Sequence, residues 1–190
     1  IIKDRQYTAK ENSQARRSAQ TALHYIVHAL ARWIAPILSF TADEIWQEIG
    51  ANTEGSIFVQ KWTELPRIET SKVMDNDYWL SVARVKTAVN KALEEQRSAG
   101  KVGKSLEAKV TLFADDDLRK SLSLLKDDLR FVLITSYADV KGLGDAPDDS
   151  VETDMPGLKL LIEKSEHEKC VRCWHHREDV GSHANHPEIC

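Results

Sequence analysis

Cysteine, proline and glycine are scarce in this sequence, whose 190 residues include 3 cysteines, 5 prolines and 8 glycines. All three cysteines lie within the last 21 positions, so they do not form the disulfide framework of a small secreted domain. No apolar run approaches the ~20 residues needed to span a bilayer, because polar residues and Pro36 interrupt the most apolar region, residues 26–40. No signal-peptide pattern opens the chain. We therefore expect a cytoplasmic protein with no membrane partner.

The chain also lacks an initiating methionine. It starts at Ile1, close to a long helical pattern, and stops at Cys190, inside a cluster of cysteines. We expect it to be a piece of a larger protein, long enough for one large domain or two small ones.

A large excess of positive charge is absent too, since the formal net charge is −4. The local balance is uneven: residues 84–104 carry six basic and two acidic side chains, whereas residues 115–154 carry eleven acidic and five basic ones. If nucleic acid binds, residues 84–104 are the favoured contact, with Arg97, Lys101 and Lys104 as candidate phosphate ligands. The alternative is an ordinary solvated helix face.

The first third of the chain has a helical pattern. Apolar residues at spacings of three and four predict a helix over residues 8–34 with one buried stripe. The stripe consists of Ala19, Ala22, Leu23, Ile26, Ala29, Leu30 and Trp33. Residues 41–44 (TADE) predict a capping box for a second helix that ends at Gly50. Two helices bury little surface alone, so we expect further helices upstream.

After an irregular segment with an extended stretch at residues 56–62, the pattern becomes mixed. It predicts a helix over residues 77–98 with Trp79 in its core face, a strand at 106–112, and a helix with core positions from 118 to 132. Strands follow at 136–142 and 158–164. The expected fold is mainly α with a small α+β part, divided into residues 1–72, residues 73–165 and a terminal knuckle at 166–190.

The terminal cysteines have the spacing of a metal site. Cys170 and Cys173 form a C-x2-C pair, and Cys190 follows 17 positions later. Thiolates at this spacing bind zinc tetrahedrally when a fourth ligand completes the site. His183 or His186 is one candidate for the fourth ligand. Two other interpretations stay open, a redox-active C-x2-C pair and free structural cysteines.

The sequence contains no catalytic pattern. We find no Ser/His/Asp or Cys/His arrangement and no paired carboxylates in an apolar setting. Residues 103–105 (GKS) end like a phosphate-binding loop, but Ser98 occupies the position of its first glycine, and a helix precedes it where a strand is required.

Several segments together resemble bacterial isoleucyl-tRNA synthetases. They are residues 3–7 (KDRQY), 17–23 (RSAQTAL), 35–46 (APILSFTADEIW), 89–94 (VNKALE), 103–108 (GKSLEA), 129–133 (LRFVL) and 169–174 (KCVRCW). The resemblance covers essentially the whole chain. Residues 35–46 resemble the valine and leucine enzymes as well, whereas residues 103–108 and the cysteine knuckle resemble the isoleucine enzyme.

This resemblance implies the helical-bundle portion of a class Ia anticodon-binding domain, followed by an α+β subdomain and a zinc knuckle. It implies a monomeric enzyme that charges isoleucine tRNA with ATP, with its catalytic and editing domains outside this chain. Cys170, Cys173 and Cys190 correspond to three of the family's four zinc cysteines. The chain would bind the anticodon region, with Trp174 as a stacking platform and Arg172 as a further phosphate contact. One alternative for Trp174 is that it covers the small core of the knuckle. An alternative function for the whole chain is a zinc-stabilised protein-interaction module with no RNA role.

Overall fold

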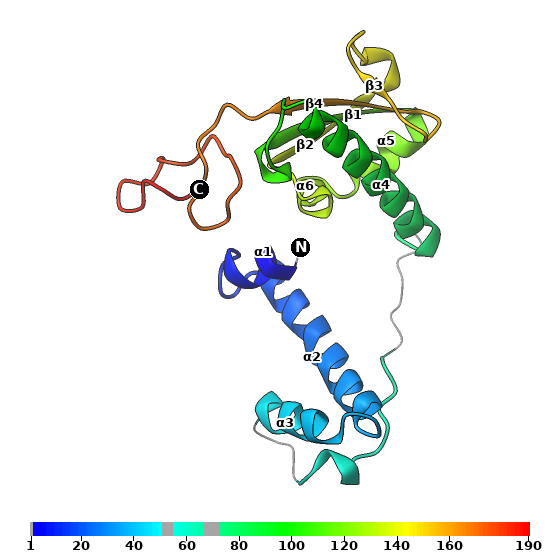
Figure 1. Cartoon of the computed structure of the whole chain (residues 1–190), viewed down its shortest axis with the longest axis vertical. Coiled ribbons are helices and arrows are strands. Elements are labelled where there is room, and N and C mark those ends of the chain that lie inside the picture. Colours follow the sequence, from blue (N-terminus) through cyan, green and yellow to red (C-terminus); the bar gives the residue numbers. More distant parts are fainter. Residues whose placement is uncertain (1, 51–54, 67–72) are drawn as a thin grey trace. The chain divides into compact units, whose positions relative to one another are not determined.

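The computed structural model describes residues 2–50, 55–66 and 73–190, and the chain forms two compact units, Ile2–Glu69 and Thr70–Cys190 (Figure 1). The domain boundary predicted after residue 72 lies outside the described residues. Among the helices of the described residues, none has the length and apolar character that a membrane crossing requires.

The first unit is helical. It contains α1 (Ile2–Tyr7), α2 (Gln14–Ile34), α3 (Ser39–Ile49) and the short 3-10 helix η1 (Ile57–Val59). The predicted start of α2 at residue 8 is wrong, because Ser13 has an extended backbone and its hydroxyl accepts a hydrogen bond from the Arg16 amide. This side-chain acceptor is the usual means of starting a helix at the following residue.

The capping box predicted at residues 41–44 is also wrong, because α3 has already begun at Ser39. Asp43 instead accepts hydrogen bonds from the Ser56 hydroxyl at 2.8 Å and the Ile57 amide at 3.1 Å. These bonds tie η1 to α3, so the stretch predicted as extended contains a helical turn. The helix ends at Gly50 as predicted, with a positive φ of 97° that glycine adopts without strain.

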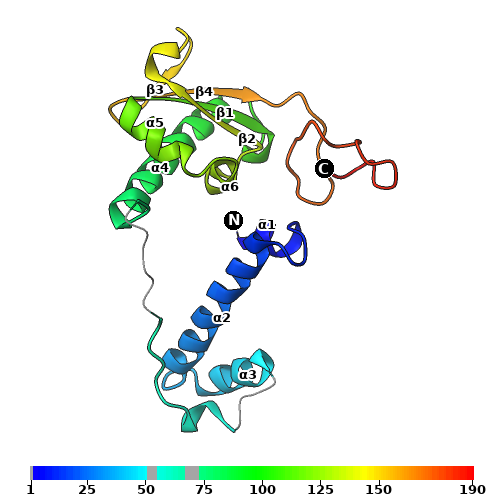
Figure 2. The same ribbon diagram turned by 180° about the vertical axis from the view of Figure 1, so that it is seen from behind.

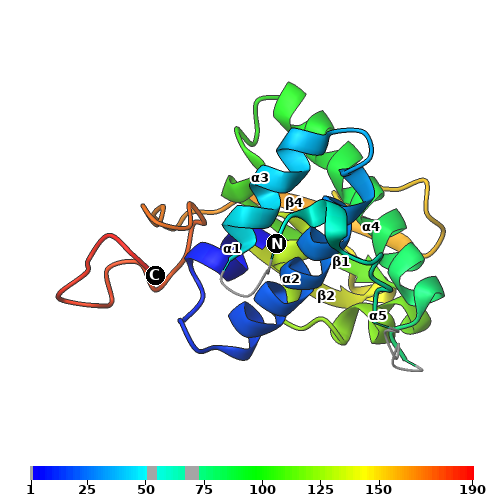
Figure 3. The ribbon, with the colours of Figure 1, turned by 90° about the horizontal axis from the view of Figure 1, so that it is seen from below.

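Trp46 is the centre of the small core between α2 and α3, which lie against each other (Figures 1 and 3). It is 2% exposed, and the Arg32 guanidinium lies 4.4 Å from its ring centre. The core uses Ala31 of α2 and Ala35, which directly follows this helix. Much of the predicted stripe is therefore not buried in this unit, and Ile26, Leu30 and Trp33 are exposed.

The second unit packs three helices against one sheet. Its elements are α4 (Asn76–Ser98), η2 (Ser105–Glu107), β1 (Ala108–Ala114), α5 (Asp116–Ser123), α6 (Asp128–Leu133), β2 (Tyr137–Gly142), η3 (Leu143–Asp145), β3 (Val151–Glu152) and β4 (Leu158–Lys164). The strand order is β2-β1-β4-β3, with β1 parallel to β2 and antiparallel to β4. The described structure therefore combines helices with a small mixed sheet, as expected.

Several predicted elements of this unit need correction. The strand predicted at 106–112 begins at Ala108, because η2 occupies the preceding residues. The single helix predicted up to residue 132 is two helices, and Lys126 between them has a positive φ of 48°. On α4 the buried aromatic residue is Tyr78, whereas Trp79 is exposed. The strand at 158–164 is confirmed.

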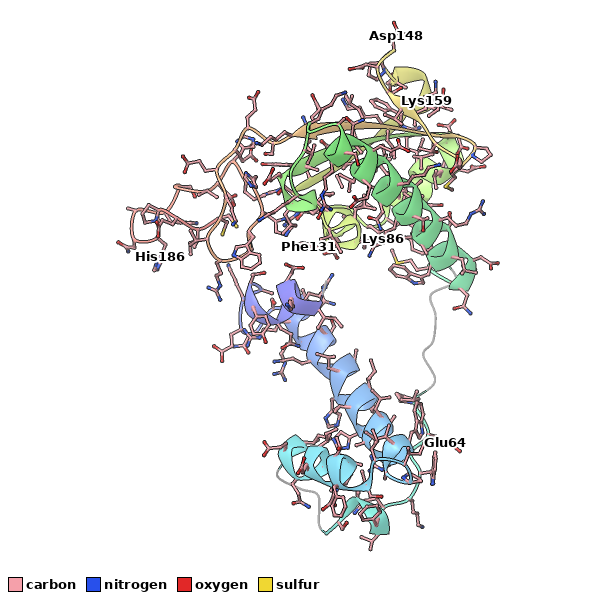
Figure 4. The ribbon with its side chains drawn as sticks, in the orientation of Figure 1. Glu64, Lys86, Phe131, Asp148, Lys159 and His186 are labelled. Carbon is pink, nitrogen blue, oxygen red and sulfur yellow. The ribbon has the colours of Figure 1, made fainter. Side chains whose placement is uncertain are left out.

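One face of the sheet carries the core of this unit. Val110, Leu112 and Leu160 are fully buried beneath α4, α5 and α6 (Figure 2). The registers place Ala108, Tyr137 and Lys164 at the same end of the sheet. The segment before β1, the turn before β2 and the terminal knuckle after β4 therefore meet at this end. The acidic loop that contains Asp148 projects away from this end of the sheet (Figure 4).

The core of the second unit can be tested with two leucines close together in sequence. Leu122 of α5 is fully buried, whereas Leu124 is 42% exposed. We expect Leu122→Ala to lower the free energy of unfolding by about 2–5 kcal/mol, because it leaves a cavity. Leu124→Ala, the control, should cost less than about 1 kcal/mol. Urea denaturation measures both, and equal losses would contradict this core.

Candidate metal centre and nucleic-acid interface

A tight turn carries the C-x2-C pair. The Cys170 amide donates to the His175 carbonyl at 2.9 Å, and the Trp174 amide donates to the Cys170 carbonyl at 2.9 Å. Trp174 has a positive φ of 66°, which reverses the chain direction after Cys173. The Val171 amide donates to the Glu188 carbonyl at 3.0 Å. This bond places the segment that ends at Cys190 alongside the turn.

The three cysteine sulfurs come together in this arrangement, all within 4.8 Å of one another. The Cys173 and Cys190 sulfurs are 3.4 Å apart, and all three cysteines are free of disulfides. Tetrahedral zinc with Zn–S bonds of about 2.3 Å separates its sulfurs by about 3.8 Å. The donor set and its spacing therefore fit zinc, which Cys170, Cys173 and Cys190 would hold.

The pKa values of these three thiols indicate how a cation would stabilise the cluster. Burial raises the pKa of Cys170, but backbone amides, first that of Cys173, outweigh burial and lower this pKa to about 7. Burial, together with the neighbouring cysteines, raises the pKa of Cys173 to about 12. The pKa of Cys190 is also raised, mainly by burial. Without a cation, the three thiols do not all ionise at neutral pH, whereas zinc binds thiolates.

The alternatives for the cysteines find little support in the geometry. A redox C-x2-C pair opens a helix, but residues 165–190 contain no helix. Neither His183 nor His186 belongs to the group of clustered ligand atoms found among the described residues. Figure 4 shows His186 in the outer part of the terminal loop.

The knuckle contacts the subdomain through the residues that follow Cys173. The His176 amide donates to the Ser136 hydroxyl at 2.6 Å, and the Glu178 amide donates to the Tyr137 hydroxyl at 3.1 Å. The Arg177 guanidinium lies 4.7 Å from the centre of the Tyr137 ring. From α6, Arg130 approaches buried His175, with 3.4 Å between Nη1 and Nδ1. The knuckle is thus attached to β2 and α6.

A hollow of about 440 Å³ lies where this knuckle meets the loop that follows α4. Its lining comes from three places: the end of α4, the loop leading into β1, and the knuckle. The lining residues are Arg97, Gly103, Lys104, Ser105, Leu106, Glu107, Lys169, Trp174 and His176. Its size is that of a pocket for a small ligand or one nucleotide.

Three of the five nucleic-acid contacts predicted from the sequence line this hollow together: Arg97, Lys104 and Trp174. Arg172 and Lys101 are outside its lining. The prediction missed Lys169, whose ammonium lies 5.3 Å from the Trp174 ring centre. It also missed Glu107, whose carboxylate accepts from the Gly103 amide at 3.3 Å. The sequence could have indicated both residues, because Glu107 lies in the GKSLEA segment and Lys169 in the KCVRCW segment.

Trp174 has the exposure of a binding surface. It is 60% exposed, although its backbone is fixed by the hydrogen bond to Cys170. A side chain that covered the knuckle core would be largely buried. The exposed ring and the cations beside it provide an aromatic face for stacking and positive charge for phosphate.

Comparison with known proteins gives two family matches. Residues 1–112 match the family described as the anticodon-binding domain of tRNA ligase. Residues 168–190 match a zinc finger found in FPG and IleRS. The first match includes the whole helical unit, α4 and the loop with Gly103 and Lys104, and the second contains the three cysteines.

Over its full length, this chain is similar to bacterial proteins named isoleucine–tRNA ligase. The protein of Teredinibacter turnerae is 56% identical over 190 residues, and that of Saccharophagus degradans is 55% identical over 190 residues. The protein of Pseudomonas fluorescens is 54% identical over 191 residues. Each match covers 100% of this chain but only 20% of the relative. The chain therefore spans about a fifth of the length of these relatives.

The metal centre can be tested by removing one sulfur. We expect Cys173→Ser to lose most of the zinc that the unaltered chain retains, because a hydroxyl is a much poorer zinc ligand than a thiolate. Val171→Ala alters an exposed residue between two ligands and is the control. Elemental analysis after gel filtration gives the zinc content. Zinc retained in full by Cys173→Ser would contradict the site.

Proposed function

We propose that this chain, which belongs to the family of tRNA-ligase anticodon-binding domains and also matches a zinc finger, is the C-terminal region of an isoleucine–tRNA ligase and binds the anticodon region of isoleucine tRNA. The observation that carries this proposal is the hollow in which Arg97, Lys104 and Trp174 meet. An exposed aromatic ring surrounded by cations matches the chemistry of an unstacked base with its phosphates.

The proposed mechanism is binding, not chemistry. An anticodon-loop base leaves the loop's stack and lies on the face of Trp174. Lys104, Lys169 and Arg97 hold the adjacent phosphates, which orients the base but carries no sequence information directly. Discrimination comes from hydrogen bonds to the edge of the base and from the fit of the hollow. Stacking contributes about 1–3 kcal/mol per base.

Zinc has a supporting role in this proposal. Cys170, Cys173 and Cys190 would hold the ion, which when bound neutralises the thiolates and stabilises the turn. The chain itself then presents Trp174, because the hydrogen bond from its amide to the Cys170 carbonyl fixes the backbone beneath the ring. We propose that the fourth zinc ligand is the family's fourth cysteine, which is not among the 190 residues of this sequence.

For the whole protein we propose a monomeric cytoplasmic enzyme that charges isoleucine tRNA in an ATP-dependent reaction. Its ATP site and catalytic residues belong to domains outside this chain. Within the chain we propose the helical-bundle portion of a class Ia anticodon-binding domain at residues 1–72. The α+β subdomain follows at 73–165 and the zinc knuckle at 166–190.

Trp174→Ala should test the stacking surface. We expect tRNA affinity to fall by about 1–3 kcal/mol, since one base loses its aromatic partner. Trp79→Ala is the control, because Trp79 is an exposed tryptophan of the same unit outside the hollow. Filter binding or fluorescence anisotropy with an isoleucine tRNA transcript measures both. Equal affinities for Trp174→Ala and Trp79→Ala would remove Trp174 from the interface.

An isoleucine tRNA with a substituted anticodon belongs in the same experiment. The proposal predicts weaker binding to the substituted tRNA than to the native one. Equal binding to both, or to neither, would contradict anticodon recognition. That result would favour a zinc-stabilised protein-interaction module, which the comparisons do not favour.

Lys104 and Lys101 provide a second, electrostatic test within one loop. Lys104 lines the hollow and Lys101 does not. We expect Lys104→Ala to weaken tRNA binding and to reduce the salt slope by about 0.7, the value for one phosphate contact on a single strand. Lys101→Ala should change the slope much less. Titrations at several salt concentrations give both slopes, and the reverse ranking would exclude Lys104.

A further inference from the structure

Ser136 lies directly before β2, where the knuckle meets the sheet. It is fully buried, with 0% of its surface exposed. Its hydroxyl donates to the Leu106 carbonyl at 2.5 Å and accepts from the His176 amide at 2.6 Å. One oxygen atom therefore joins two segments that lie 30 and 40 residues from it in the sequence.

The backbone of Ser136 adds to the same connection. Its amide donates to the Ala108 carbonyl at 3.0 Å, and its carbonyl accepts from the Arg177 guanidinium at 3.4 Å. The residue thus contacts the start of β1 with its preceding loop on one side and the knuckle on the other. A serine is the smallest side chain that both donates and accepts hydrogen bonds, which suits this enclosed position.

Both joined segments form walls of the hollow. Leu106 and His176 line it themselves, with Lys104 two residues before Leu106 and Trp174 two residues before His176. The Ser136 hydroxyl therefore holds together two walls of the hollow, the loop wall with Lys104 and the knuckle wall with Trp174. The Ser165 amide, which donates to the Glu107 carbonyl at 2.7 Å, ties the same loop to the start of the knuckle segment. The bonds of Tyr137 and the approach of Arg130 attach the knuckle to β2 and α6.

We propose that Ser136 is a positioning residue for the nucleic-acid hollow, joining the loop that carries Lys104 to the metal knuckle that carries Trp174. This inference rests on the proposed function for its ligand, an unstacked nucleotide with its phosphate. Removal of the hydroxyl leaves the Leu106 carbonyl and the His176 amide, both in partly buried positions, without this partner. The two walls then separate or admit water, and one nucleotide no longer contacts both.

The first test compares Ser136→Ala with Thr153→Val. Thr153 is the control, because its hydroxyl also joins two backbone groups, donating to the Leu158 carbonyl at 2.7 Å and accepting from the Met155 amide at 3.2 Å, but lies outside the hollow. We expect Ser136→Ala to lower tRNA affinity about tenfold while zinc content is retained. Thr153→Val should lose thermal stability yet keep affinity within about twofold. Equal affinity losses in the two variants would overturn the inference.

Rescue separates positioning from general stability. Ser136→Thr keeps the hydroxyl but adds a methyl group to a buried site, so it should lower the melting temperature and still bind tRNA more tightly than Ser136→Ala. In a Trp174→Ala background, Ser136→Ala should cost less than about threefold in affinity, because one of the positioned walls is already removed. Full additivity of the two substitutions would overturn the inference.

Hydrogen exchange tests the connection without tRNA, first without a variant at Ser136. Zinc removal from the wild-type chain by a chelator should speed amide exchange at residues 174–177 and also at 105–107. Faster exchange confined to the knuckle would overturn the inference. If the wild-type chain binds no tRNA, the proposed function fails. Coupled exchange would then still show that the knuckle and the loop before β1 are linked, and loss of that coupling in Ser136→Ala would assign the link to Ser136.

Discussion

The close packing of three cysteine sulfurs within 4.8 Å of one another is the constraint on which the C-terminal part of this structure depends. Residues 165–190 contain no helix, and their buried side chains are Ser165, Cys170 and His175, which are too few and too polar for an apolar core. The turn is closed by backbone hydrogen bonds, and individual bonds of this kind contribute only about 1 kcal/mol net. A shared cation would supply what burial does not, because the three thiolates, which repel one another, would all be attracted to it.

The constraint extends beyond the cysteines, because each of the three residues after Cys173 makes a contact that fixes its position. Trp174 takes a left-handed backbone with its amide bonded to Cys170, so the ring direction follows from the turn. His175 and His176 then contact α6 and Ser136. On the other side of the hollow, α4 and the loop before β1 are fixed by the buried core of the sheet. The hollow therefore has one wall stabilised by apolar burial and one formed by the turn that carries the cysteines.

Features encoded locally could be predicted from the sequence, and features that depend on distant contacts could not. The strand at 158–164, the helix over 77–98 and the cysteine spacing each follow from residues close together in the chain. The capping box at Thr41 failed because tertiary contacts recruit Asp43 to Ser56 and Ile57 instead. Ser136 has no local pattern at all, since its partners lie 30 and 40 residues away. Arg97, Lys104 and Trp174 were found through charge clustering and motif position, although their meeting in one hollow required the fold.

Electrostatics alone gives this chain little affinity for RNA, and that makes the geometry of the hollow decisive. The net charge is −4, and nearby carboxylates already pair with cations of α4: Arg97 with Glu94 at 3.0 Å and Lys91 with Asp154 at 2.6 Å. If the three cations lining the hollow bind phosphates of a single strand, the release of counterions gives a salt slope of about 2. This slope is small beside the value of about 10 for a protein that binds DNA through many phosphates. In the proposed function, affinity and discrimination therefore come from one base fitted between Trp174 and the opposite wall of the hollow. A misplacement of either wall would remove that fit, so the buried Ser136 hydroxyl that joins the two walls would affect recognition without touching the RNA.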